Sequence, residues 1–134
     1  MTGVQTCALP ISVDPGWGTA YLARIVGEKK AREIWFLCRK YSAADAEKMG
    51  LVNKVVPHDQ LDAEVDQWCK EINEMSPTAL TIAKRSFNAD TENIRGIGFL
   101  GIQTVKHYYQ SDESKEGVKA FNERRKPDFK KHTG

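Results

Sequence analysis

The sequence of 134 residues predicts a mostly α-helical chain with one short strand. Apolar residues recur at steps of three and four along most of it, which is the period of an α-helix. Ser, Thr and Asp stand where these runs begin, and Gly or Pro stands where they end. One segment, residues 51–56 (LVNKVV), has the character of a strand and ends at Pro57.

The first two helices are predicted over residues 19–27 and 28–40. Thr19 can cap the first, and Gly27 is the residue type that most often ends a helix. The apolar side of the first helix consists of Leu22, Ile25 and Val26. The second helix has one apolar stripe, formed by Ala31, Ile34, Trp35 and Cys38.

Two further helices are predicted before residue 76. Ser42 and Asp45 have the spacing of a capping box, and Gly50 ends the short helix that they begin. Asp59 is expected to cap a longer helix. Its apolar residues repeat at steps of four and three, which indicates core packing: Leu61, Val65, Trp68, Ile72 and Met75.

The last three helices follow Ser76, residue 91 and Ser114. Pro77 restarts the chain, since proline at the first helical position loses no hydrogen bond. The residues expected to face inward are Leu80, Ala83, Phe87, Ile94, Ile97, Val105 and Tyr108. Gly96, Gly98 and Gly101 each cost about 1 kcal/mol relative to Ala in a helix, so packing must supply the difference. The final helix stops before Pro127.

Five segments occur in one order along the chain: 14–19 (DPGWGT), 22–35 (LARIVGEKKAREIW), 49–53 (MGLVN), 76–80 (SPTAL) and 116–121 (EGVKAF). This order resembles the C-terminal half of the crotonase (enoyl-CoA hydratase/isomerase) superfamily. Within it the resemblance is to the branch of 1,4-dihydroxy-2-naphthoyl-CoA synthase and 2-ketocyclohexanecarboxyl-CoA hydrolase. It implies an α/β fold, the C-terminal part of the crotonase (ClpP-like) spiral, in a fragment that is mostly α-helical.

The resemblance divides the chain into three parts. Residues 1–11 are expected to be a non-native leader, because they resemble the translation of a sequencing-adapter oligonucleotide. Residues 12–75 correspond to the end of the crotonase core. Residues 76–134 correspond to a C-terminal helical region for oligomerisation and CoA contact.

The resemblance also assigns five site residues. Its Ser-x-Asp pattern matches Ser12 and Asp14, and a tyrosine delivered into a neighbouring subunit's site matches Tyr109. Asp14 would move a proton at the carbon next to a thioester carbonyl, and Tyr109 would donate to an oxygen that gains charge. Phe121 and Arg124 match the family's CoA contacts.

Each of these residues also has a purely structural interpretation. Asp-Pro-Gly is an ordinary turn sequence, so Asp14 could cap the first helix. Two adjacent tyrosines at a helix end are typical of interface packing, with Tyr108 as the core partner. Phe121 could belong to the core of a solvated helix.

By resemblance, the parent protein is an acyl-CoA carbon–carbon bond enzyme. It would close a ring of o-succinylbenzoyl-CoA by an intramolecular Claisen reaction, in menaquinone biosynthesis. The alternatives are ring opening by a 2-ketocyclohexanecarboxyl-CoA hydrolase in benzoate degradation, another member of the family, or an inactive fragment that serves only assembly. The oxyanion hole of the family belongs upstream of Ser12, so the fragment alone is expected to be inactive.

Composition limits the kinds of partner and the cellular compartment that we expect for the protein. The chain has 20 basic and 18 acidic residues and no recognised nucleic-acid reading motif, which disfavours nucleic-acid binding. No apolar run approaches the roughly 20 residues of a membrane span. The three cysteines lack metal-ligand spacing and fit reduced thiols in the cytoplasm. We therefore expect no metal and no tightly bound cofactor. CoA would enter as part of the substrate, and the family implies a homo-oligomer, a trimer or hexamer.

Overall fold

The computed structural model describes Asp14 and residues 16–132, so the expected leader and Ser12 lie outside the described residues. The described chain is mostly helical, as the sequence predicts. The α-helices are α1 (Trp17–Val26), α2 (Glu28–Leu37), α3 (Ala43–Lys48), α4 (Leu61–Asn73), α5 (Pro77–Asp90), α6 (Arg95–Gln110) and α7 (Asp112–Asn122). Short 3-10 turns are η1 (His58–Gln60), η2 (Glu92–Ile94) and η3 (Phe129–His132).

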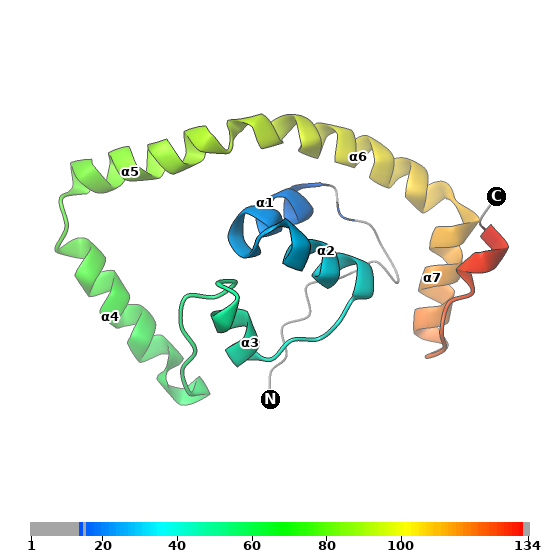
Figure 1. Ribbon diagram of the computed structural model, residues 1–134, viewed down its shortest axis with the longest axis horizontal. Helices are drawn as coiled ribbons and strands as arrows, with labels where there is room; N and C mark the ends of the chain where they lie inside the picture. Colours follow the sequence, from blue (N-terminus) through cyan, green and yellow to red (C-terminus); the bar gives the residue numbers. More distant parts are fainter. Residues whose placement is uncertain (1–13, 15, 133–134) are drawn as a thin grey trace.

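The helices form an inner group and an outer arc. Helices α4, α5 and α6 follow one another around α1, α2 and α3, and α7 turns back from the end of α6 with η3 beside it (Figure 1). Helices α1 and α2 pack on each other, and α1 also contacts α6. The inner group therefore meets the arc along α1.

The core lies between α1 and α2. Leu22 packs there with Ala31 and Ile34, and Ile34 is only 1% exposed. The partly buried residues around them are Ala23, Val26, Trp35, Tyr41, Met49 and Leu51. This confirms the apolar stripe predicted for α2. The helix ends earlier than predicted, at Leu37, because Cys38 takes a left-handed φ of 48°.

Two of the predicted helix starts are confirmed. The Ser42 hydroxyl accepts a hydrogen bond from the Asp45 N–H at 3.1 Å, and the Asp45 carboxylate accepts one from the Ser42 N–H at 3.3 Å. This is the reciprocal capping box. The Ser76 hydroxyl accepts from the Ala79 N–H, with Pro77 at the first helical position of α5.

Three predicted caps are wrong by a few residues. Thr19 lies inside α1, where its hydroxyl donates to the Gly16 carbonyl, and the Asp14 carboxylate accepts the backbone N–H groups instead. Asp59 lies within η1 and caps nothing, because an extra 3-10 turn precedes α4. Helix α7 starts at Asp112, and the cap is Ser111, which accepts from the N–H of the buried Ser114.

The strand predicted over residues 51–56 does not form. Leu51 and Val52 donate their N–H groups to the Ala46 carbonyl, and Val55 donates to the Glu47 carboxylate at 2.8 Å. These donors are turned back to α3 and cannot pair with another strand. No described residue belongs to a strand, so an extended segment here has no neighbour.

The apolar faces of α4 and α5 are exposed, which corrects the expectation that they form core. Val65 and Ile72 on α4 are each 51% exposed, and Phe87 on α5 is 76% exposed. The other exposed residues of these faces are Leu61, Trp68, Met75, Leu80 and Ala83. The helical spacing of the apolar residues in α4 and α5 was predicted correctly. However, within the described chain α4 packs chiefly on η1 and α5 on η2, and these short turns leave most of both faces uncovered.

Glycines allow α1 to approach α6 closely. A Cβ on Gly98 would lie 2.6 Å from Cδ1 and Cε2 of the Trp17 indole, and a Cβ on Gly16 would lie 2.6 Å from the Ile97 side chain. Gly98 is buried, so the indole occupies the place of a side chain. At Gly98 this contact is the packing that has to offset the cost of a glycine within a helix.

A second contact, made by Arg24, joins α1 to the outer arc at the end of α5. The Arg24 guanidinium donates to the Asp90 carbonyl and carboxylate at 3.0 and 3.1 Å, and to the Asn93 side chain at 3.1 Å. The planar guanidinium satisfies several acceptors at once. Arg24 therefore holds the turn between α5 and α6 against α1.

The C-terminal turn is held by what we call the Glu116 clasp: Glu116, Arg125, Glu123 and the backbone N–H of Asp128. Arg125 binds both oxygens of the Glu116 carboxylate, at 2.5 and 2.9 Å, and also donates to Glu123 at 2.6 Å. The Asp128 N–H donates to Glu116 at 2.8 Å. Hydrogen bonds from Arg125 and from this N–H lower the pKa of Glu116 to about 2.

Two expectations about the chain as a whole concern thiols and membranes. Cys69 is a free, exposed thiol. None of the helices in the described ranges is long and apolar enough to cross a bilayer.

The glycine contact predicts opposite effects for two alanine substitutions in α6. Gly98→Ala should lower the free energy of unfolding by about 1–3 kcal/mol, because the added methyl group displaces the Trp17 indole. Gly96→Ala is the matched control. Nothing lies within 4 Å of its Cβ position, so it should raise stability by up to about 1 kcal/mol. Denaturant unfolding and tryptophan fluorescence measure both, and equal effects would contradict the contact.

The clasp predicts a specific acid dependence of stability. Glu116 has a folded pKa of about 2, below its ordinary 4.5, so its contribution is complete above pH 4.5 and is lost as the pH falls towards 2. The charged groups around it are Arg125, Glu123, Asp128 and His132. The difference in unfolding free energy between the unmodified protein and Glu116→Gln should therefore shrink over this interval. A pH-independent difference would mean that the ionised carboxylate does not stabilise the turn.

Candidate functional site

Asp14 lies just before helix α1 and binds its first N–H groups. Its Oδ1 accepts the Gly18 N–H at 3.2 Å and its Oδ2 accepts the Thr19 N–H at 2.8 Å. Gly16 between them has φ 99°, a left-handed conformation that turns the chain back over the carboxylate. The positive end of the helix dipole also favours an anion at this place. The structural interpretation of Asp14 as a cap is therefore realised in the fold.

Capping does not use all of the acceptor capacity of the Asp14 carboxylate. An ionised carboxylate has about four lone-pair sites, and each oxygen of Asp14 accepts one backbone hydrogen bond among the described residues. The side chain is half-buried. A Cβ at Gly18 would lie 2.9 Å from Asp14 Oδ1 and 3.3 Å from Trp35 Cζ2, so the carboxylate and the Trp35 indole both border this glycine. The bonds fix the carboxylate in one direction and leave acceptor sites for a further proton donor.

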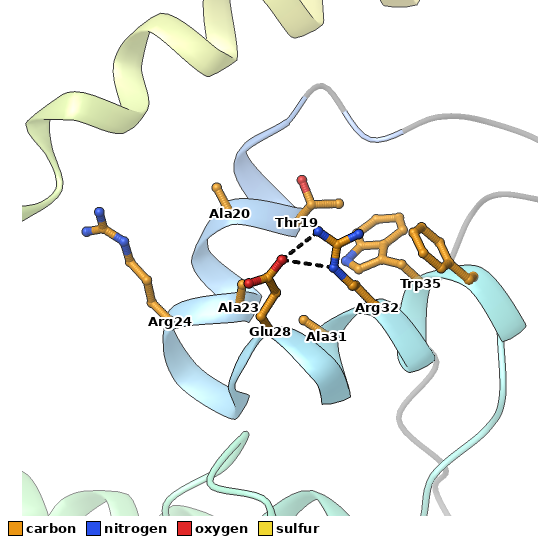
Figure 2. Close-up of a pocket in the computed structure, with 9 residues that line it drawn as sticks. Thr19, Ala20, Ala23, Arg24, Glu28, Ala31, Arg32 and Trp35 are labelled. Atoms are coloured by element: carbon orange, nitrogen blue, oxygen red, sulfur yellow. Dashed lines mark hydrogen bonds and ion pairs between the residues drawn. The ribbon is translucent and has the colours of Figure 1, made fainter.

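A groove of about 530 Å³ lies beside this point, between α1 and α2. The small side chains of alanines 20, 23 and 31 leave room for the groove, and Trp35 lies at one end of it (Figure 2). Phe36 also lines the groove. Across it Glu28 binds Arg32, with the Glu28 oxygen 2.9 Å from Nε and 2.5 Å from Nη2. This pair has the i, i+4 spacing of a surface helix pair, so the sequence could have revealed it. Thr19 and Trp35 link the groove to the surroundings of Asp14.

Tyr109 lies in the last turn of α6 and faces α7. It is 50% exposed and lines a pocket of about 480 Å³ together with Ser114, Lys115, Val118, Lys119, Asn122 and Glu123. Its ring meets that of Tyr108 edge-on, with centroids 5.8 Å apart. Burial raises the pKa of Tyr108, which is the more buried of the two. Tyr109 is thus the exposed member of the pair and lines the pocket, and Tyr108 is partly buried.

Phe121 and Arg124 lie together at the end of α7. Phe121 is 66% exposed, so it is not a core residue of this chain. Its carbonyl accepts the Arg124 N–H at 3.2 Å, and Arg124 has a left-handed φ of 54°. An aromatic ring and a cation thus lie three residues apart at one helix end, and both residues are exposed.

The structure brings these residues together in two separate groups. Tyr109, Phe121 and Arg124 belong to the α6–α7 end of the arc, whereas Asp14 lies at the start of α1. Helix α1 meets α6 at Gly98, and eleven residues of helix from there to Tyr109 span roughly 16 Å. Within one chain the described residues show no contact between Asp14 and Tyr109. A site that uses both would draw them from two copies of the chain.

Sequence reasoning missed the Glu116 clasp. Glu116 and Arg125 are nine residues apart and lie on either side of a helix end, a spacing that helical periodicity does not pair. No group of His, Cys, Asp and Glu side chains within the described ranges could hold a metal ion.

Comparison with known proteins identifies the family. The model of the enoyl-CoA hydratase/isomerase family matches residues 9–132. An enoyl-CoA hydratase from Mycobacterium avium subsp. paratuberculosis K-10 is 30% identical, with a TM-score of 0.76 over 90% of this chain and 50% of that one. An enoyl-CoA hydratase/isomerase from Pseudoalteromonas atlantica T6c is 26% identical, with a TM-score of 0.77 over 84% of this chain and 46% of that one.

The fold is also shared with more distant proteins. The carnitinyl-CoA hydratase from Mycobacterium avium is 22% identical and has a TM-score of 0.82, over 92% of this chain and 49% of that protein. The chain thus spans about half the length of the solved structures that it matches. These structures confirm the predicted crotonase fold class, of which the described residues form a mostly helical part. The match over residues 9–132 shows that this chain belongs to the enoyl-CoA hydratase/isomerase family, within the crotonase superfamily.

Proposed function

We propose that this chain is part of an acyl-CoA enzyme that closes a ring by forming a carbon–carbon bond, as 1,4-dihydroxy-2-naphthoyl-CoA synthase does. The observation that carries the proposal is the Asp14 carboxylate, which two backbone N–H groups fix at the start of α1 while acceptor sites remain. The sequence pattern around it supports this branch of the family, since Ser12 and Asp14 match the Ser-x-Asp of the synthases.

In the proposed reaction, Asp14 removes a proton from the carbon next to the thioester carbonyl of o-succinylbenzoyl-CoA. The resulting enolate carbon attacks the carboxyl carbon of the same molecule, and the ring closes with loss of water. Tyr109, from a second copy of the chain, donates a hydrogen bond to an oxygen that gains negative charge. Ser12 lies outside the described residues and is included only because it matches the Ser of the Ser-x-Asp pattern. Phe121 and Arg124 would contact the nucleotide part of CoA.

The second candidate is ring opening by a 2-ketocyclohexanecarboxyl-CoA hydrolase. Three segments resemble that group at least as well as the synthases: 56–65 (VPHDQLDAEV), 83–88 (AKRSFN) and 112–117 (DESKEG). Both reactions pass through an enolate next to the thioester, so the same aspartate and tyrosine would serve either of them. The substrate assay therefore has to distinguish the two.

The complete enzyme that contains this chain should be assayed with both substrates, together with Asp14→Asn. The asparagine side-chain oxygen can still accept one of the two helix N–H groups but cannot take the proton, so turnover should fall by about 10²- to 10⁴-fold. Thermal unfolding of Asp14→Asn is measured in parallel, so that the loss of a helix hydrogen bond is separated from the loss of the proton acceptor. If Asp14→Asn keeps full turnover, Asp14 is only a cap and the mechanism is wrong.

Tyr109 is tested by a matched pair of substitutions. Tyr109→Phe removes only the phenol hydroxyl and should lower kcat by about 10²-fold, the usual loss of one hydrogen-bond donor to a developing oxyanion. Tyr108→Phe makes the same change in the adjacent, more buried ring and should leave kcat within a few-fold. Steady-state kinetics on both variants gives the comparison. Equal losses would point to packing of the aromatic pair instead of chemistry.

A further inference from the structure

Helix α7 ends in a turn with a left-handed position that is ordinarily occupied by glycine. The Arg125 N–H donates to the Ala120 carbonyl at 3.0 Å, and the Arg124 N–H donates to the Phe121 carbonyl at 3.2 Å. This is the Schellman pattern, whose left-handed position is here Arg124, with φ 54°. A side chain in this conformation costs roughly 1–2 kcal/mol. Something else must therefore hold the turn.

The Glu116 clasp joins the two sides of this turn. Glu116 lies on α7 before the turn, Arg125 follows the left-handed residue directly, and the Asp128 N–H comes three residues later. Both oxygens of the carboxylate are used, and its side chain is only 16% exposed. Paired hydrogen bonds between a guanidinium and a carboxylate fix direction as well as distance. The clasp thus determines the path of the chain through Arg124.

The clasp also separates the roles of the two adjacent arginines. Arg125 is neutralised by Glu116 and Glu123. Arg124 forms no ion pair with any residue in the described part of the chain, and it is exposed. Its cation remains available for an anionic ligand. Phe121 is five residues after Glu116, about 140° around the helix, so it faces away from the clasp and stays exposed.

We propose that Glu116 is a positioning residue for the nucleotide part of CoA: through Arg125 it fixes the left-handed turn that presents Arg124 and Phe121 to the phosphates and the adenine. Glu116 itself touches no ligand. The inference rests on the proposed function, because it takes the contact of Phe121 and Arg124 with CoA from there. It adds the group that holds this pair in place.

The test compares two ligands on the complete enzyme, coenzyme A and pantetheine, which lacks the nucleotide. Calorimetry should show that Glu116→Gln weakens coenzyme A binding about tenfold, the usual effect of losing a hydrogen bond to a charged group. Pantetheine affinity should not change. Arg125→Lys keeps the charge but loses the paired geometry, so it should weaken coenzyme A binding similarly. The matched control is Glu113→Gln, the same change on an exposed residue of α7, which should leave both affinities within twofold.

Two further variants separate this inference from the proposed function. If Arg124→Ala and Phe121→Ala weaken coenzyme A binding but Glu116→Gln does not, the positioning role is wrong and the CoA contact stands. If neither Arg124→Ala nor Phe121→Ala has an effect, the CoA contact itself is wrong. A loss of affinity for both ligands in Glu116→Gln would indicate general damage to the fold and would also overturn the positioning role. Circular dichroism of each variant records whether the helices are retained.

Discussion

The contact between the start of α1 and the glycines of α6 is the constraint on which this structure depends. The inner helices meet the outer arc along α1, where the Trp17 indole lies on Gly98 and Arg24 binds Asp90 and Asn93. The same turn places Asp14 above the first backbone N–H groups of α1. The geometry of the proposed proton acceptor and the attachment of the arc are therefore set by one short segment.

The sequence predicted the helices well because their information is local. Apolar spacing located α1, α2 and α4 to α7, and the Ser42–Asp45 capping box was found from two residues. The burial of α4 and α5 could not be read in the same way. An apolar stripe such as that of Val65 and Ile72 shows which side of a helix avoids water, but it does not show which surface covers it. The strand at 51–56 failed for a related reason, since a strand needs a neighbour.

The candidate site also contains residues that local sequence patterns reveal and residues that they do not. Asp14, Tyr109, Phe121 and Arg124 could be named from sequence patterns, and the last two share one helix end, where the Arg124 N–H donates to the Phe121 carbonyl. The Glu116 clasp could not be named, because it depends on a left-handed turn at a residue that is not glycine. Nothing in the residue spacing indicates that Arg125 folds back towards Glu116 while Arg124 stays exposed.

The double use of Asp14 has a consequence for the proposed chemistry. Each time this carboxylate took a proton from a substrate, the N–H groups in the first turn of α1 would lose the negative charge that they bind. Trp17, which contacts Gly98 of α6, belongs to the same turn. Protonation of Asp14 would thus weaken the packing of α1 on α6, and loss of the proton would restore it. The contact between the two helices would therefore change with each turnover.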